Sequence, residues 1–535
     1  MSRLAILALA LFLLAPPGQA LAHGIGVSQD LPVPTWLYLF SASAVVLVSF
    51  AAIALFGDLF VGHSPRKYRR ANLLQNEALR AALTNGPLLF GLRLLSVGLF
   101  LLVVLSGLFG RQVASSNFAP TFVWIVWWVG FSFFVAFVGN LWPLVNPWKV
   151  LFEWAEALAR RLGAGKGLEL GKPYPASLGV WPALVLYAAF AWVEIVFEGS
   201  ATPLNIALFV LLYSALTWTG MVVYGKGVWL RNGEAFSVFF DVLARFAPSE
   251  VRVTDPKPCE DCGVCPAAEE GCMNCYECFA RSVPEDRELN LRFPSVGLRS
   301  AEWASSDRLF FVIFVLASVT YDGLATTPPG VALIGSTTMP RTLGLVALPL
   351  LFLVVYLVFV KLSQLFGGTY VPFGSLAASY VYSLVPIAIA YQAAHYFTLL
   401  LIQGQEIITL LSDPFGWGWN VFGTAGYEIK TGIIEADTVW KAQIALIVGG
   451  HVIAIYLAHV VALRFLPDPK RAMWSQYPML VLMIFYTCFS LWILSQPIVE
   501  ENRTTSESVS QSSANAATTG VASDAVRAPR KGGAL

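Results

Sequence analysis

Charged residues are scarce in this chain of 535 residues, where Asp, Glu, Lys and Arg together make up 13% of the positions. Soluble domains carry about 25%, so this composition excludes an ordinary soluble enzyme and a disordered chain. The 34 Lys and Arg residues nearly balance the 33 Asp and Glu residues, so no basic excess suggests nucleic acid as a partner. The seven cysteines are too few and too clustered to build a disulfide scaffold.

Long apolar stretches take the place of the missing charge. Apolar residues make up 57% of the chain, and its 37 Phe and 17 Trp suit helices in lipid with aromatic rings at the interfaces. Ten stretches come near the ~20 residues that a helix needs to cross a bilayer: residues 36–60, 88–109, 119–141, 177–198, 204–224, 309–327, 343–363, 375–402, 442–464 and 477–496. The sequence predicts an all-α, polytopic transmembrane helix bundle of about ten spans in contact with the lipid bilayer.

The spans fall into two halves, helices 1–5 within residues 23–248 and helices 6–10 within residues 301–499, with a cysteine-rich loop at 249–300 between them. Residues 1–22 have the pattern of a signal peptide: Arg3, a short apolar run and the small-residue site Ala20-Leu21-Ala22. An uncleaved anchor is the alternative. Residues 500–535 are rich in Ser, Thr, Ala and Gly and predict a disordered external tail.

Positive charge orients the spans. Lys and Arg gather in the loops after the first, third, fifth and ninth spans and are nearly absent from the others. This alternation predicts that the basic loops are cytoplasmic and that both termini of the mature chain are outside. Within the cytoplasmic connector of the first half, residues 235–243 predict an amphipathic helix that lies on the membrane.

A few ionisable residues fall inside the spans, where they are costly and therefore candidates for function. Glu194, Asp322, His395 and His451 all fall in the outer halves of their spans, whereas His459 is two turns deeper than His451. Imidazole and carboxylate ligands suit a divalent metal such as Zn, Mn or non-haem Fe. We expect a metal site, with Zn the first choice, that opens to the outer face and uses Asp322 and Glu194 in catalysis.

Two other roles remain open for the same histidines, namely contacts to a haem or a quinone and hydrogen-bonded packing between helices. His23 is a separate candidate metal ligand. After signal-peptide cleavage it would be the N-terminal residue and would offer both an amine and an imidazole nitrogen.

Six cysteines form two C-x-x-C-x-x-C runs in the loop at 249–300: Cys259, Cys262, Cys265, Cys272, Cys275 and Cys278. In a reducing cytoplasm such a cluster predicts metal binding rather than disulfides. Paired C-x-x-C motifs serve tetrahedral Zn. An iron–sulfur cluster is the alternative, although the fourth position of a ferredoxin run is taken by Glu269. A cytoplasmic redox or regulatory partner would be expected at this loop.

Several stretches resemble the bacterial integral-membrane fenitrothion hydrolases, and the resemblance runs over nearly the whole chain. They are Ala22-His23-Gly24, Gln29 to Pro34, Asn146-Pro147-Trp148, Glu234 to Val238, Tyr321-Asp322-Gly323, Ala394 to Phe397, Gln403-Gly404-Gln405, Ser412-Asp413-Pro414, Gly416 to Asn420, Gly450-His451 and Ala458-His459. The resemblance implies a multi-pass protein of the bacterial cytoplasmic (inner) membrane that hydrolyses apolar organophosphate triesters. The cysteine-rich loop departs from the family pattern and adds a redox or regulatory role.

Three functions remain open. A hydrolase would use metal-bound water, held by His395, His451 and Asp322, to attack phosphorus. A redox protein would pass electrons from the cysteine loop to a haem or quinone near the histidines. A transporter for a metal or small solute would use the intramembrane carboxylates.

Overall fold

The protein is described by a computed structural model that covers residues 35–60, 68–163, 167–255, 257, 272–299, 305–466 and 468–496. The predicted signal peptide with His23, the predicted tail, and Cys259, Cys262 and Cys265 lie outside these described residues. The fold below is that of the unit from Leu31 to Gln496.

Within the described ranges, nine helical segments are long and apolar enough to cross a membrane. They are Glu77–Phe109, Phe118–Phe137, Ala176–Ile195, Pro203–Tyr224, Ser306–Ala325, Thr338–Gly367, Phe373–Ser412, Ala436–Phe465 and Pro469–Leu494. The remaining predicted span corresponds to α2 (Thr35–Phe60), of which Leu39–Ala52 forms a shorter apolar stretch. A helical multi-pass membrane architecture therefore agrees with the prediction.

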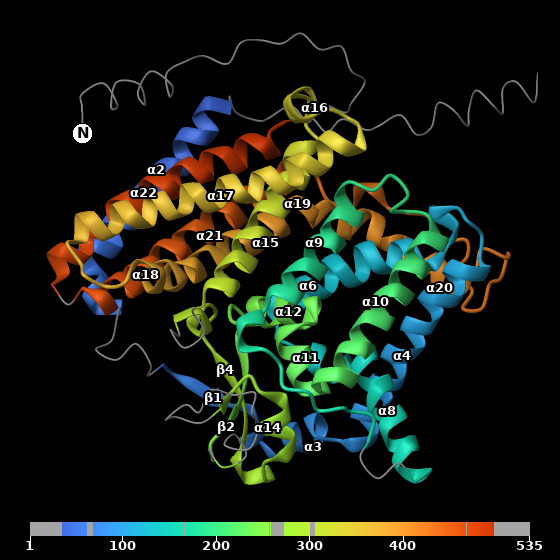
Figure 1. Cartoon of the computed structure of the whole chain (residues 1–535). Helices are drawn as coiled ribbons and strands as arrows, with labels where there is room; N and C mark the ends of the chain where they lie inside the picture. Colours follow the sequence, from blue (N-terminus) through green and yellow to red (C-terminus); the bar gives the residue numbers. More distant parts are fainter. Residues whose placement is uncertain are drawn as a thin grey trace, which may run out of the picture. The chain divides into compact units, whose positions relative to one another are not determined.

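The helices pack in two groups (Figure 1). One contains α2, α15 (Ser306–Ala325), α17 (Thr338–Gly367), α19 (Val385–Ile402), α21 (Ala436–Phe465) and α22 (Pro469–Leu494). The other contains α4 (Gly86–Phe109), α9 (Trp181–Ile195), α10 (Pro203–Tyr224) and a run of three short helices, α5 (Phe118–Pro120), the π-helix η3 (Thr121–Phe131) and α6 (Ser132–Phe137). Contacts of α15 with α9 and of α19 with η3 join the two groups.

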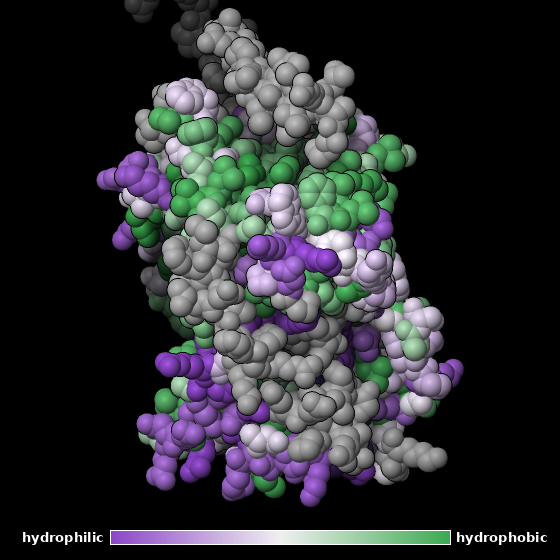
Figure 2. Space-filling view, turned by 90° about the vertical axis from the view of Figure 1, so that its left-hand side faces the viewer, coloured by the Kyte–Doolittle hydropathy of each residue, from purple (hydrophilic) through white to green (hydrophobic). Residues whose placement is uncertain are grey.

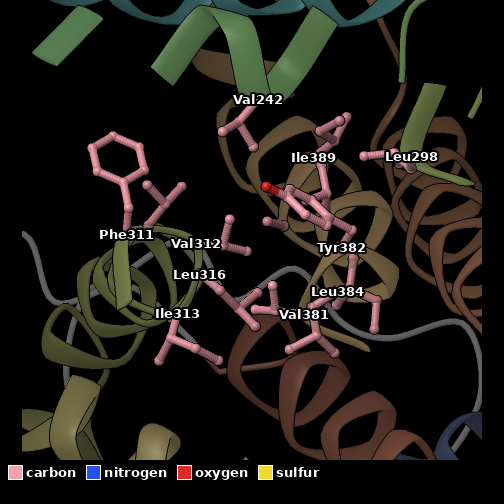
Figure 3. Close-up of a cluster of buried hydrophobic side chains, with 14 of the residues drawn as sticks. Val242, Leu298, Phe311, Val312, Ile313, Leu316, Val381, Tyr382, Leu384 and Ile389 are labelled. Atoms are coloured by element: carbon pink, nitrogen blue, oxygen red, sulfur yellow. The ribbon is translucent and has the colours of Figure 1, made fainter. Parts of the chain in front are cut away.

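Helix α12 (Ala235–Ala244) also lies where the two groups meet, with contacts to α6, α9 and α19. The prediction that this segment lies on the membrane surface is wrong, because eight of its ten residues are buried. Its sequence is apolar around the whole helix apart from two positions, which is typical of a core helix. Figure 3 shows Val242 of α12 facing Phe311 and Val312 of α15 and Ile389 of α19.

A four-stranded antiparallel sheet, absent from the sequence prediction, lies at one end of the helices (Figure 1). Its order is β1 (Arg70–Asn72), β4 (Arg287–Arg292), β2 (Ser249–Val253) and β3 (Cys272–Met273). In register, Ala71 lies opposite Leu291, and Val251 opposite Leu289. We call this end of the protein the sheet side. Figure 2 shows hydrophilic residues at this lower end and a hydrophobic band above it.

The four loops with most of the positive charge gather on the sheet side. The loop after α2 supplies β1, which pairs with β4 from the loop after α10. Helix α8 (Pro147–Arg161) is bridged to that same loop by Lys226, whose Nζ is 3.4 Å from Glu156 Oε2. After α21, the Arg464 guanidinium donates to the Arg299 carbonyl. Loops that share one side of a membrane are expected to meet in this way.

Candidate metal centre and intramembrane polar cluster

Three cysteines on the sheet side form a compact group of thiol ligands. The sulfur atoms of Cys272, Cys275 and Cys278 lie within 4.8 Å of one another, and the three residues are 4%, 8% and 0% exposed. Elsewhere in the described ranges, no set of three His, Cys, Asp or Glu ligand atoms is this close. Buried soft thiolates fit Zn or an iron–sulfur cluster, so these three residues can bind a metal.

A short strand and a tight turn bring the three sulfurs together. Cys272 lies on β3 opposite Val253 of β2, and Asn274 then takes up a left-handed conformation with φ 54°, which Asn tolerates well. Hydrogen bonds hold the turn, because the Asn274 N–H donates to the Val251 carbonyl (2.7 Å) and Asn274 Oδ1 accepts from the Val251 N–H (3.2 Å). Cys275 directly precedes α14 (Tyr276–Arg281), and Cys278 lies in its first turn.

The surroundings of the thiols are apolar on one side and anchored to the helices on the other. Val253 and Phe279 pack against the three cysteines, and such a shell limits access of water to a bound metal. Tyr276, next to Cys275, donates its hydroxyl to the Asn140 carbonyl at 2.5 Å. Burial raises the pKa of Tyr276, so the hydroxyl stays protonated as a donor at neutral pH.

A buried ion pair holds the sheet against the helices. Arg292 Nη1 of β4 is 2.5 Å from Glu250 Oε2 of β2, and the two side chains are 2% and 0% exposed. The same guanidinium donates to the carbonyls of Ala244 (3.2 Å) and Ala247 (3.2 Å), at and just beyond the C-terminal end of α12. The sheet that carries the cysteines is thereby fixed to a helix in the core of the protein.

An apolar cavity of about 400 Å³ begins at the segment that Tyr276 contacts. Leu141 and Trp142, which follow Asn140, form part of its wall. Most of the remaining wall comes from α4, η3, α9 and α10 and is rich in aromatic rings. Trp127 of η3 packs edge-to-face on Phe236 of α12 at a centroid distance of 4.6 Å. π-Helical turns occur frequently at functional sites.

A second group of polar residues lies inside the helices, toward the ends of α9 and α15 that are distant from the sheet. Asp322 Oδ2 is 2.9 Å from His395 Nε2 and accepts a hydrogen bond of 2.7 Å from the Tyr396 hydroxyl. The same hydroxyl lies 3.4 Å from Glu194 Oε1. The structure thus brings together three of the residues singled out from the sequence, from α9, α15 and α19.

The other two intramembrane histidines have separate partners. His451 Nδ1 lies 2.8 Å from the Ile447 carbonyl, one turn earlier in α21, and its ring packs on Tyr486 at 5.9 Å. His459 Nδ1 lies 3.1 Å from Gln476 Oε1 of α22. Neither ligand atom belongs to a three-ligand group among the described residues, so the geometry does not place His451 and His459 in one metal site with His395. His23 lies outside the described residues.

Two polar contributors were missing from the sequence prediction. Tyr396 bridges Asp322 and Glu194, and its position directly after His395 was the available signal. Glu234, which is fully buried, caps α12 by accepting from the backbone N–H groups of Phe236 (2.9 Å) and Ser237 (2.7 Å). A negative charge is favourable at the N-terminus of a helix, so the lone carboxylate in front of this apolar run was the available signal.

Comparisons with known proteins do not extend this picture. No family model matches the chain. No curated protein matches it, and neither does any solved structure. The resemblance to the fenitrothion hydrolases therefore stays a prediction, and the geometry described above is the ground for any functional assignment.

Proposed function

We propose that this protein is a membrane redox protein, in which a metal centre held by Cys272, Cys275 and Cys278 exchanges electrons with a carrier dissolved in the bilayer. The observation that carries the proposal is the group of three buried sulfur atoms that lie within 4.8 Å of one another. Tyr276 anchors this group to the segment at which the wall of the apolar cavity begins. A purely structural Zn site would serve the sheet equally well, so the identity of the metal is decisive.

On this proposal the sheet side is cytoplasmic, because the loops rich in Lys and Arg gather there. An iron–sulfur cluster would supply one-electron chemistry at the centre, with its fourth ligand expected from the run of Cys259, Cys262 and Cys265. A soluble electron-transfer protein is the expected partner on this side. The residues of the chain contribute the apolar shell, which excludes water, and the anchoring contacts that fix the centre against the helices.

The test compares two cysteine variants of the full-length protein. Cys278→Ser removes a fully buried ligand and is expected to abolish most of the bound metal, together with its visible absorption and its reduction by dithionite. Cys488→Ser is the matched control, because Cys488 lies in α22 with its Sγ 3.0 Å from Ser43 Oγ, and it should keep wild-type metal content. Bound zinc with no redox-active iron, or equal metal in both variants, would reject the proposal.

A second function is favoured by the Asp322–His395 pair, namely hydrolysis of an apolar ester. A carboxylate that hydrogen-bonds one imidazole nitrogen orients the ring, so that the other nitrogen can act as a general base toward water. His395 is 16% exposed and Asp322 19% exposed, which leaves the pair accessible. On this second proposal Glu194 and Tyr396 complete the polar cluster, and the substrate is an organophosphate triester that partitions into the bilayer.

A further inference from the structure

The apolar cavity has a chemical preference that its hydrogen bonds define. Most of its wall consists of aromatic and aliphatic side chains, including Trp127 and Phe131 from η3 and Phe190 from α9. Such walls favour a flat ring over a flexible acyl chain, because offset and edge-to-face ring contacts add to the burial of area. The cavity volume of about 400 Å³ lies within the range of small-molecule sites.

The two hydroxyl side chains of the wall, Ser96 and Tyr213, already donate their protons to groups of the protein. The Tyr213 hydroxyl donates to Glu234 Oε1, and the Ser96 hydroxyl donates to the Val145 carbonyl. Glu234 is fixed as the acceptor because it also caps α12. Both hydroxyl oxygens are therefore left with lone pairs only, which accept hydrogen bonds from a ligand and cannot donate to one.

The indole groups of the wall show the same pattern. Four tryptophans line the cavity, and three of them donate their indole N–H to another group of the protein. The acceptors are the Ser200 carbonyl for Trp124 (3.0 Å), Ser214 Oγ for Trp148 (2.7 Å) and Glu234 Oε2 for Trp142 (3.4 Å). A ligand that brings its own donors is consequently matched to this wall, whereas a ligand with acceptors alone makes no hydrogen bond to the lone pairs of the Tyr213 and Ser96 oxygens.

We infer that the cavity binds a lipophilic phenol-type ligand, with an alkyl hydroquinone as the form present in membranes, in preference to the corresponding quinone or ether. The hydroquinone ring lies among the aromatic side chains, and its hydroxyl groups donate to Tyr213 and Ser96. The inference rests on the proposed function for the role of this ligand as an electron carrier, while its binding depends only on the cavity.

The experiment measures equilibrium binding of a labelled decyl hydroquinone to the full-length protein in lipid nanodiscs, with empty nanodiscs subtracted. Its dimethyl ether is the matched ligand, since it keeps the ring and the tail but lacks both donors. The loss of both hydrogen bonds predicts roughly thirtyfold weaker binding of the ether. Equal binding of the two compounds would overturn the inference, as would the absence of saturable binding, the result expected if a lipid acyl chain fills the cavity.

Variants locate the site. Ala189→Trp adds a large ring to a cavity-lining position of α9 that is not packed in the core, and it is expected to weaken hydroquinone binding at least tenfold. Val185→Trp, one turn earlier on α9 and 65% exposed, lies outside the lining and should bind within twofold of wild type. Equal affinity in the two variants would overturn the assignment to this cavity.

The Cys278→Ser variant separates this inference from the proposed function. It should bind the hydroquinone as wild type does, because Cys278 is not part of the cavity wall. If the wild-type protein binds the hydroquinone but contains no redox-active metal, the proposed function is rejected and the cavity assignment stands. A redox-active centre in a protein that does not bind the hydroquinone rejects the cavity assignment alone.

Discussion

Loss of the Glu250 charge should loosen the sheet that carries the cysteines. Glu250→Gln keeps the size of the side chain but leaves the Arg292 guanidinium, 2% exposed, without its ionic partner. Removing one member of a buried pair costs about 3–5 kcal/mol. With about 1.36 kcal/mol per factor of ten, this corresponds to a rise of roughly 10² to nearly 10⁴ in the population of the locally open sheet.

The assay is amide hydrogen exchange of the purified protein in nanodiscs, read by mass spectrometry on peptides from β2 and β4. In the regime where closing outpaces exchange, protection follows the free energy of local opening, so the protection factors of these strands should fall by the ratio given above. Peptides from α17, which packs mainly against α15, α18 and α22, should be unchanged.

The matched control is Glu288→Gln in β4. Glu288 Oε2 pairs with Arg252 Nη1 at 3.5 Å, and its side chain is 22% exposed. Pairs that reach solvent contribute about 0–1 kcal/mol, so protection should change by less than about tenfold. Equal effects of the two substitutions would refute the reasoning, because they would show that burial of the Arg292–Glu250 pair adds nothing to the free energy of local opening of the sheet. A double variant, Glu250→Gln with Arg292→Gln, should regain part of the protection, since the buried Arg292 charge is then no longer left without its partner.

Two further predictions concern the polar cluster and the response to pH. His395→Gln should abolish any hydrolysis of a nitrophenyl phosphorothioate while insertion into the membrane is retained, as measured by nitrophenolate release; undiminished turnover would exclude His395 as the base. Burial alone would raise the pKa of Asp241, but the guanidinium groups of Arg245 (3.0 Å) and Arg308 (3.5 Å) outweigh burial and lower it. The unfolded value is about 3.9, so this contribution to stability is complete above that pH and is lost as the pH falls through the folded pKa. The deficit in melting temperature of Asp241→Asn should therefore be largest at pH 7 and shrink toward pH 3.5, and an equal deficit at both pH values would contradict the assignment.

The residues that could be found from sequence were those whose chemistry contrasts with their surroundings. Asp322 and His395 stand out as ionisable groups in apolar spans, and their similar depth follows from a rise of 1.5 Å per residue. Depth alone does not fix the direction in which a side chain points around its helix. His451 has a suitable depth, but the packing of α21 against α22 turns its ring toward Tyr486.

The sheet and the buried helix α12 could not be recognised from local patterns. Strand β1 has three residues and pairs with β4, more than 200 positions later in the chain. Such a short strand shows no alternation of apolar and polar residues from which it could be predicted. In α12 the apolar run was visible, yet a helix on a membrane and a helix in a protein core both require one. Only the contacts of α12 with α6, α9 and α19 distinguish the two cases.

The length of α15 separates the intramembrane polar cluster from the sheet that carries the cysteines. Asp322 lies sixteen residues after Ser306, which places it ~24 Å further along the helix, toward the end distant from the sheet. The Asp322–His395 pair therefore cannot share a metal with Cys272, Cys275 and Cys278. The cavity wall, by contrast, includes Leu141, the residue directly after Asn140, whose carbonyl Tyr276 contacts. On the redox proposal, a carrier in the bilayer reaches the cysteine centre through the cavity and not through the histidines, so we expect that the two sites can be inactivated independently.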